Sequence, residues 1–288
     1  MIEASINLDV KIYTPESTLL QSPKLMLSEM WFDLLASREL AWRLLVRDIS
    51  ARYRQSFLGI FWAFVPPIVM AFGLFAARKA NVINISETNI PYIAYVMLSM
   101  ILWQTFTQSL MSPIIALQQA RPMLAKINFP REALILAKVG EILFDFLIKL
   151  IMVIGIFIYF QLGVSWSLCF VPFALFTLIA FGLFLGIMLA PISSLYTDVQ
   201  QALSILTRIW LFLTPVIYPP PTTGVFSSIV NLNPVTHLLV TTRDLATGTA
   251  ISNLSGFFIS VVIAWLGLSI AWVFYRMAMP FIIERMSA

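Results

Sequence analysis

Four charged side chains lie at helical spacing within one apolar stretch of the chain. They are separated by three, four and four residues and so share one face of a helix: Lys138, Glu141, Asp145 and Lys149. Inside a membrane, ionisable residues of this kind mark either a transport path or an ion pair that faces the protein interior. For Asp145 and Lys149 we expect a structural ion pair, and a site on a transport path is the alternative.

A single cation, Arg208, lies near the middle of another apolar segment, 199–218. A charge that faces lipid costs at least about 2.5 to 3.5 kcal/mol, so Arg208 needs a carboxylate, backbone carbonyl groups or water. Two interpretations are open. Arg208 pairs with a buried carboxylate such as Asp145, or it lines a transport path and meets phosphate groups of a substrate.

Residues for bond-making chemistry and for metal binding are scarce. The sequence has one histidine, His237, and one cysteine, Cys169, so the clusters of His and Cys that hold a metal are absent from it. None of its eleven glycines begins a Gly-x-x-x-x-Gly-Lys-Ser/Thr phosphate loop, the usual motif for ATP hydrolysis. We expect no catalytic residue, no metal and no cofactor on this chain, and we assign no role to His237.

The composition is that of a membrane protein. Hydrophobic residues make up 60% of the 288 residues and charged residues only 11%, with a mean hydropathy of +0.90. Soluble domains have about 25% charged residues, so this chain could not cover its surface with polar groups in water. The net charge of +4 is small, and it predicts membrane topology rather than binding to nucleic acid.

Six segments are apolar over the roughly 20 residues that cross about 30 Å of hydrocarbon. They are 57–77, 92–112, 131–160, 168–191, 199–218 and 254–275. With the N-terminus inside, twelve Lys and Arg fall on inner segments and three on outer ones, which places both termini in the cytoplasm. We therefore expect an all-α, multi-pass protein of the cytoplasmic (inner) membrane, with an N-terminal segment 1–56, a transmembrane domain 57–275 and a cytoplasmic tail 276–288.

Two further segments are predicted to be helical without crossing the membrane. From Lys24 to Ser56, apolar residues recur at three- and four-residue spacings with the arginines mostly off that stripe, which is typical of an amphipathic helix in the membrane interface. On the outer side, the run Pro219-Pro220-Pro221 ends the fifth span, and 235–247 is too short to cross. We expect a re-entrant or surface helical hairpin there, packed against protein.

Several short strings, in a fixed order along the chain, resemble the membrane subunits of bacterial ABC transporters that export polysaccharides. They are Arg47-Asp48, Arg52-Tyr53-Arg54-Gln55-Ser56, Leu58-Gly59 with Trp62 and Pro66, Lys126-Ile127-Asn128-Phe129-Pro130-Arg131-Glu132, Thr214-Pro215-Val216-Ile217-Tyr218-Pro219, and Asn233-Pro234 followed by Arg243-Asp244. One position departs from the family's pattern. Thr197 precedes Asp198 where an arginine is expected, so that loop lacks the expected cation.

The resemblance implies a homodimer of six-span subunits paired with two copies of a separate ATP-binding subunit, which holds ATP and Mg. Members of the family export O-antigen, capsule or teichoic acid polymers carried on a lipid, through a channel at the dimer interface. On this basis, the residues expected to couple to the ATP-binding subunit are Arg47, Arg52, Arg54, Arg121, Lys126, Phe129, Arg131 and Asp198. The alternatives are plain membrane anchoring for the amphipathic helix and plain positive-inside charge for the loop 121–131.

Flat aromatic rings are the expected contacts of a sliding polysaccharide, because sugar rings present apolar C–H faces that stack on them without fixed hydrogen bonds. We expect six aromatic residues, together with Arg208, to line the path: Trp62, Trp103, Phe106, Trp210, Phe212 and Tyr218. The pair on the second span and the pair on the fifth are spaced so that each shares one helical face.

Two other classes of protein are the alternatives to a permease. An ion-coupled carrier needs polar residues clustered at the membrane midplane, and these are scarce apart from Asp145, Lys149 and Arg208. A membrane enzyme acting on lipid-linked sugars needs general acids and bases, and one histidine with few carboxylates provides little for that work. We therefore expect a transport subunit that catalyses no bond chemistry itself.

Overall fold

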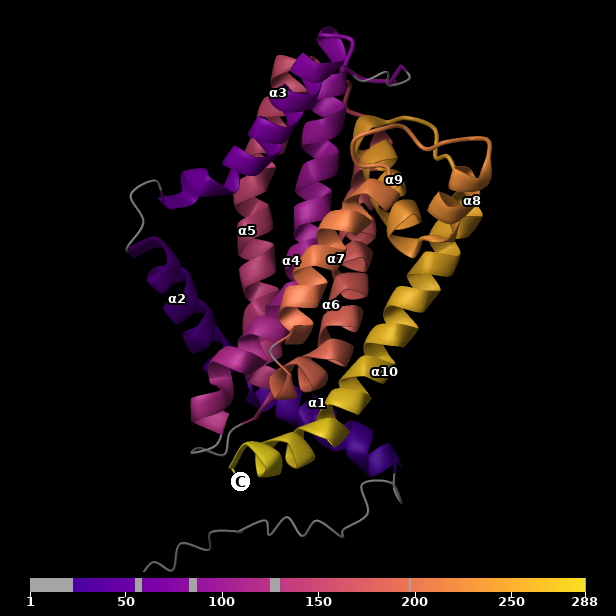
Figure 1. Cartoon of the computed structure of the whole chain (residues 1–288). Coiled ribbons are helices and arrows are strands. Elements are labelled where there is room, and N and C mark those ends of the chain that lie inside the picture. Colours follow the sequence, from indigo (N-terminus) through magenta and orange to yellow (C-terminus); the bar gives the residue numbers. More distant parts are fainter. Residues whose placement is uncertain (1–22, 55–58, 83–86, 125–129, 197, 288) are drawn as a thin grey trace, which may run out of the picture.

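The computed structural model describes residues 23–54, 59–82, 87–124, 130–196 and 198–287, and the regular elements in these ranges are all helices (Figure 1). The α-helices are α1 Pro23–Ala36, α2 Arg38–Arg54, α3 Val65–Lys79, α4 Tyr92–Leu124, α5 Glu132–Tyr159, α6 Val171–Leu195, α7 Asp198–Leu213, α8 Val225–Leu232, α9 Pro234–Thr247 and α10 Leu254–Ser287. Two 3₁₀ turns, η1 Gly59–Ala63 and η2 Trp166–Phe170, precede α3 and α6. The predicted all-α class is confirmed.

The long helices form a bundle with two distinct ends (Figure 1). The helix α1 and the C-terminal end of α10 lie at one end, called the inner end here, while α8 and α9 lie at the opposite, outer end. The helix α4 stands in the middle, packed against α3, α5, α6 and α9, and most of its residues are buried. The core of the subunit is therefore built around α4.

The central pair, α4 and α6, approaches closely because α6 carries glycines on the side that faces α4. A Cβ placed on Gly182 would lie 2.6 Å from the Cβ of Ser109 and 2.9 Å from the carbonyl oxygen of Phe106, and one on Gly186 would collide with the carbonyl oxygen of Leu110. In membranes, helices associate by such close packing, since lipid removes the hydrophobic drive between them. These two glycines therefore set the spacing at the centre of the bundle.

Three helical stretches among the described residues are long and apolar enough to cross a membrane: Glu132–Tyr159, Trp166–Leu195 and Leu254–Ile282. They coincide with the third, fourth and sixth predicted spans. The helix α4 covers the second predicted span and continues beyond it to Leu124, and α10 continues past 275 to Ser287, so the predicted tail is largely helical. The protein is a multi-pass membrane protein, and the number of six spans stays a prediction.

The first predicted span, 57–77, is interrupted. The turn η1 comes before α3, and α3 itself has only 15 residues. Pro66 and Pro67 lie in the first turn of α3 rather than inside a continuous span. A proline in the first turn leaves no intrahelical hydrogen bond unmade, because the N–H groups there have no partner within the helix. The two prolines therefore begin a helix where the apolar run alone predicted its interior.

The fifth predicted span, 199–218, ends early. The helix α7 stops at Leu213 after 16 residues, which corresponds to about 24 Å at 1.5 Å per residue. Pro215 explains the end, because proline has no N–H to continue the helix and disfavours helical geometry at the preceding residue, Thr214. Residues 214–217 follow as a buried, non-helical extension.

The segment predicted as one amphipathic helix is two helices, α1 and α2, joined at Ser37. The hydroxyl of Ser37 donates to the carbonyl oxygen of Leu34 at 2.8 Å, a local bond that competes with regular helix geometry. Trp31 and Trp42 are 58% and 64% exposed, so these two indoles of the predicted stripe face away from the bundle. Two other residues of the stripe pack on α5, because Leu45 lies against Gly140 and the Tyr53 ring lies 6.3 Å from that of Phe144. The buried side also carries Met30, Ser37, Ala41 and Leu44.

The outer segment contains two short helices, α8 and α9, as a helical hairpin requires. The side chain of Asn233 accepts a hydrogen bond from the amide of Val235 at 3.1 Å, and Pro234 occupies the first helical position. Both features are favoured at a helix start. Because α9 packs against α4, α6 and α10, most of its side chains are buried. Its helical state is confirmed, and its depth in the membrane stays a prediction.

Candidate functional site

A line of charged side chains joins α2 to α5 on one flank of the bundle. Asp48 and Arg52 are one turn apart on α2, and they face Lys138, Glu141 and Asp145 on α5. The Nζ atom of Lys138 lies 3.0 Å from the Asp48 carboxylate and 2.7 Å from the Glu141 carboxylate. Arg52 uses both terminal nitrogens, at 2.9 Å from Glu141 and 2.7 Å from Asp145. We call these five residues the ion-pair ladder.

The ladder is largely shielded from solvent. The side chain of Glu141 is 3% exposed and that of Lys138 is 10% exposed, while Arg52, at 44%, is the most open member. Burial raises the pKa of Asp48, but hydrogen bonds from Arg47 and Lys138 outweigh it and hold that pKa below its ordinary value. Each buried carboxylate therefore faces a cation, as burial of charge requires.

Asp145 does not form the ion pair predicted from spacing. In the described part of the chain, its carboxylate is bound by Arg52 and by the side-chain amide of Gln108 on α4, and no hydrogen bond or ion pair joins it to Lys149. The alternative partner, Arg208, is exposed on α7 and does not reach Asp145 either. The spacing identified the charged face of α5 correctly, but it could not reveal partners on α2 and α4.

The arginines of α2, predicted to contact an ATP-binding subunit, lie in two settings. The helix α2 rises from the inner end along the flank of α5 (Figure 1), and Arg52 turns onto α5. The guanidinium of Arg52 is engaged within the subunit, its side chain is 44% exposed, and its contact with a partner stays a prediction. Arg47 and Arg54 are exposed, with Arg47 held 2.8 Å from the neighbouring Asp48, and their contact with a partner stays a prediction.

Three further predicted contacts lie where helices begin or end at the inner end. Arg121 is in the last turn of α4, Arg131 directly precedes α5, and Asp198 is the exposed first residue of α7. The Nε atom of Arg121 is buried and has no hydrogen-bond partner within the described ranges. Lys126 and Phe129 lie outside the described residues. All five stay predicted contacts.

Three of the aromatic residues predicted to line a path form a cluster inside the subunit. The ring centroid of Trp210 on α7 lies 6.5 Å from that of Trp103 and 5.4 Å from that of Phe106, both on α4, and the latter two are 5.3 Å apart. Trp103 is 4% exposed and Phe106 is fully buried. In this arrangement Phe106 offers no surface to a sugar ring, so the strip expected on α4 is not available. The cluster instead packs α7 against the core.

The other predicted path residues lie on or near the surface of the subunit. Trp62 on η1 is 57% exposed, and Tyr218 is half-buried, with its hydroxyl donating to the carbonyl oxygen of Phe212 at 2.8 Å. Only Leu203 and Thr207 are buried along α7. The remaining exposed side includes four residues at helical spacing, which we call the α7 face: Ile205, Arg208, Ile209 and Phe212.

A second polar site lies at the outer end, where the extension of α7 is held by side chains from α4 and α9. The last carbonyl groups of a helix have no partner within it. Here Tyr92 donates to the carbonyl oxygen of Ile217 at 2.9 Å, and Tyr95 donates to that of Tyr218 at 2.8 Å. The amide of Asn233 adds a bond to the Thr214 hydroxyl at 3.0 Å.

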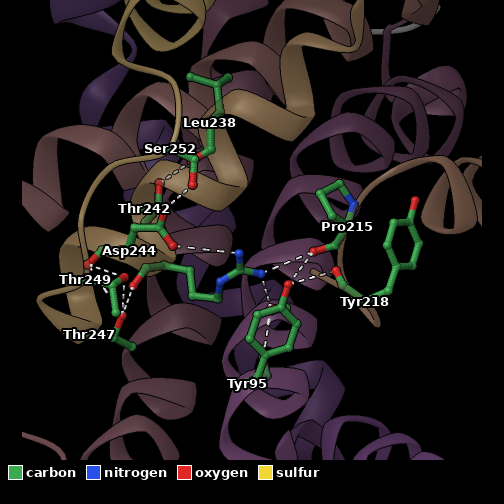
Figure 2. Close-up of polar contacts among 11 residues, drawn as sticks. Tyr95, Pro215, Tyr218, Leu238, Thr242, Asp244, Thr247, Thr249 and Ser252 are labelled. Atoms are coloured by element: carbon green, nitrogen blue, oxygen red, sulfur yellow. Dashed lines mark hydrogen bonds and ion pairs between the residues drawn. The ribbon is translucent and has the colours of Figure 1, made fainter. Parts of the chain in front are cut away.

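Arg243 lies at the centre of this site and is 3% exposed. Its guanidinium donates to the Ser99 hydroxyl at 3.0 Å and to the Pro215 carbonyl oxygen at 3.2 Å, and it stacks 4.0 Å from the ring centre of Tyr95. Figure 2 shows Tyr95 and Pro215 on one side of this arrangement and Asp244 on the other. The Asp244 carboxylate, 3.7 Å from the guanidinium, accepts from Ser252 at 3.3 Å. We call Tyr92, Tyr95, Ser99, Arg243 and their partners the outer network.

The outer network explains why three separate strings stand out in the sequence. The string 214–219 supplies the carbonyl groups, Asn233-Pro234 starts α9 and bonds Thr214, and Arg243-Asp244 provides the buried charges. From the sequence, Tyr218 of these strings was assigned to the path, no role was assigned to Arg243 or Asp244, and Tyr92 and Tyr95 were missed. Two tyrosines three residues apart at the start of an apolar helix were the available signal.

His237, to which no role was assigned from the sequence, is buried. Its Nε2 atom lies 2.8 Å from the carbonyl oxygen of Asn231. A Cβ on Gly256 of α10 would lie 2.6 Å from the imidazole ring, so the ring fills the contact between α9 and α10. Its place is that of a packing residue, and no functional role is assigned to it.

Comparison with known proteins gives a consistent result. The family model of the ABC-2 type transporter matches residues 39–246. An O-antigen export system permease protein, RfbA, from Myxococcus xanthus is 28% identical over 210 residues, which cover 72% of this chain and 80% of the relative. A protein of the same name from Klebsiella pneumoniae is 25% identical over 235 residues, covering 78% of this chain and 87% of the relative.

The matched range begins at the start of α2 and ends within the last turn of α9, so it includes the ion-pair ladder, the α7 face and the outer network. It spans well over half of the chain. Taken together with the apolar helices that can cross a membrane, the match shows that this chain belongs to the ABC-2 type transporter family, as a transport subunit of the membrane.

Proposed function

We propose that this chain is the permease subunit of an ABC transporter that exports an O-antigen-type polysaccharide, carried on a lipid, across the cytoplasmic membrane. The names of the relatives support this substrate class. The energy comes from a separate ATP-binding subunit, because the sequence contains no phosphate loop of its own. Two copies of each subunit form the working complex.

The α7 face is the observation that carries this proposal. Arg208 is exposed on a helix whose neighbouring exposed residues, Ile205, Ile209 and Phe212, are apolar. An arginine directed at lipid costs at least about 2.5 to 3.5 kcal/mol, so ionisable residues in membrane helices face a partner or a water-filled path. In a homodimer the two α7 faces enclose such a path, where Arg208 meets the phosphates of the lipid carrier and Phe212 meets the sugars.

The topology of the proposed permease has six crossings with both termini in the cytoplasm. The short helices α3 and α7 cross together with their extensions, the 3₁₀ turn η1 and the non-helical residues 214–217. The distribution of Lys and Arg supports this orientation, and α1 and the end of α10 lie at the same end of the bundle (Figure 1). Loops at the inner end then face the ATP-binding subunit.

The decisive experiment replaces Arg208 in a host that lacks the native gene for this chain. Deletion should cause lipid-linked polymer to accumulate on the inner side of the membrane, and the wild-type chain should restore polymer at the cell surface. Arg208→Gln should export poorly, whereas Arg208→Lys should keep part of the activity because it keeps the charge. Arg43→Gln, an exposed arginine of α2, is the matched control and should export normally. Normal export by Arg208→Gln would remove the α7 face from the path.

A second experiment tests the division of labour between the subunits. The purified chain alone should not hydrolyse ATP, and hydrolysis should appear when it is reconstituted with its ATP-binding subunit in bilayers. Hydrolysis by the isolated chain at a rate comparable to the complex would contradict the proposal.

A further inference from the structure

The helix α2 is joined to the bundle by the ion-pair ladder and by a narrow apolar contact, in which Leu45 lies against Gly140 and the Tyr53 ring lies 6.3 Å from that of Phe144. Only Ala41 and Leu44 are buried along its length, while the apolar side chains of Trp42 and Val46 are exposed on the other side. Apolar contact by itself is non-directional, whereas ion pairs favour one order of charges. The ion-pair ladder therefore adds a directional constraint to the position of α2 along α5.

The order of the charges permits one register between the two helices. Along α2 the charges run negative, then positive, and along α5 they run positive at Lys138, then negative at Glu141 and Asp145. A shift of α2 by one turn toward the C-terminal end of α5 would bring Asp48 beside two carboxylates. A shift in the other direction would bring Arg52 beside Lys138. Both shifts place like charges together in a buried site, which is strongly unfavourable.

The ladder continues from α5 into the centre of the subunit. The amide of Gln108, on the central helix α4, donates to the same carboxylate of Asp145 that Arg52 binds. Three helices are thus connected without a gap from the flank of the bundle to its core, through Arg52, Asp145 and Gln108. Continuous chains of packed side chains, hydrogen bonds and ion pairs of this kind carry energetic coupling between distant sites.

We propose that the ion-pair ladder makes α2, α5 and α4 move as one body and so carries the motion of α2 into the transport path. Arg52, Glu141, Asp145 and Gln108 are positioning residues in this scheme. The inference rests on the proposed function, because an ATP-driven partner has to move α2. It assigns to Arg52 a role inside the permease, in place of contact with the partner.

The test compares export with ATP hydrolysis in the assembled transporter. In the Arg52→Gln variant we expect assembly and ATP hydrolysis near the wild-type level, and polymer exported per ATP lower by about tenfold, within the range of about two- to thirtyfold that changes in coupling elements produce. Arg43→Gln removes the same charge from an exposed i,i+4 pair of the same helix and should change neither quantity. Unchanged export per ATP in Arg52→Gln overturns the proposal.

A milder variant decides the matter if Arg52→Gln fails to assemble. Gln108→Leu alters no charge and breaks only the contact between Asp145 and α4. Lower export per ATP in an assembled Gln108→Leu transporter supports the ladder as a connection to the core. Normal export per ATP overturns it, because α4 would then receive motion by another route.

A substrate-free measurement separates this inference from the proposed function. With Cys169→Ser as background, spin labels at Trp42→Cys on α2 and Ile151→Cys on α5 report the distance between the helices, and both positions are exposed. The labelled subunit is diluted with unlabelled subunits so that each complex carries one labelled pair. In the wild-type background the distance should stay the same with and without ATP. In the Arg52→Gln variant the distribution of distances should become broader. If the wild-type distance changes with ATP, the inference is overturned even if polysaccharide export is confirmed. If the wild-type distance stays constant, the inference is supported even if the substrate is another polymer.

Discussion

Replacement of Arg243 by leucine should destabilise the subunit more than any other loss of a single arginine in the described helices. The side chain is 3% exposed, and its removal deprives the Pro215 carbonyl oxygen and the Ser99 hydroxyl of a donor and the Tyr95 ring of its cation. It also leaves the Asp244 carboxylate, 7% exposed, without its cation. Breaking a buried pair from one side costs about 3 to 5 kcal/mol.

The magnitude can be refined from the geometry. The separation of 3.7 Å between Arg243 and Asp244 makes this a weak ion pair, so its loss lies toward the lower end of that range. A desolvated cation over an aromatic ring adds about 2 kcal/mol, and contact with Tyr95 is close, at 4.0 Å. We therefore expect a loss of about 3 to 5 kcal/mol in total, or about 5 to 8 °C in Tm for a chain of this size.

The assay is thermal unfolding of the purified subunit in detergent, with Arg208→Leu as the matched control. Arg208 is exposed on α7, so its loss should change the free energy of unfolding by no more than about 0.5 kcal/mol. We thus expect Arg243 to contribute to stability and Arg208 to contribute to transport. Equal shifts in Tm for the two variants would refute the reasoning, because burial and partners would then not determine the outcome.

Three further predictions follow from single contacts. Gly186→Ala should lower the stability of the purified protein by about 1 to 3 kcal/mol by forcing α4 and α6 apart. Gly155→Ala, with open space around its Cβ, should not. Equal unfolding temperatures of the two variants would contradict the close approach of α4 and α6. The pKa of Asp48 is held below its ordinary value of 3.8. The contribution of Asp48 to docking of α2 is therefore complete above pH 3.8 and is lost as the pH falls through that lower pKa. A fluorophore on α2 should report this acid transition, and Asp48→Asn should remove it. Phe212→Ala should reduce export at unchanged stability, whereas Phe106→Ala should cost about 3 to 5 kcal/mol of stability; loss of export without loss of stability in Phe106→Ala would restore that ring to the path.

The sequence predicted the helices whose limits depend on hydrophobicity alone. The third, fourth and sixth spans are long apolar runs, and the structure contains helices there. The first and fifth spans differ because Pro66, Pro67 and Pro215 decide where α3 begins and α7 ends. An apolar run with a proline in it looks the same whether the proline lies inside a span or at its edge, so hydropathy could not locate these limits.

The candidate site was predicted only as far as local spacing reaches. Helical periodicity identified the charged face of α5, but Arg52, which completes it, lies 93 residues before Asp145. The same limit applies to Trp103 and Phe106, which share a face of α4 as expected. Which side of α4 faces α7 is a property of the packed bundle, and no pattern within α4 encodes it.

The ion-pair ladder has a consequence for the synthesis and membrane insertion of the protein. The chain is made from its N-terminus, so α2 is complete before α5 enters the membrane. Lys138 and Glu141 can pair within α5 during insertion, since they are three residues apart on one helix, but the direct ion pair of Asp145 among the described residues is made by Arg52 of α2. The N-terminal helix thus acts as a built-in insertion partner for a later span. A chain shortened past Arg52 would insert α5 without this partner for Asp145, so we expect less folded protein in the membrane.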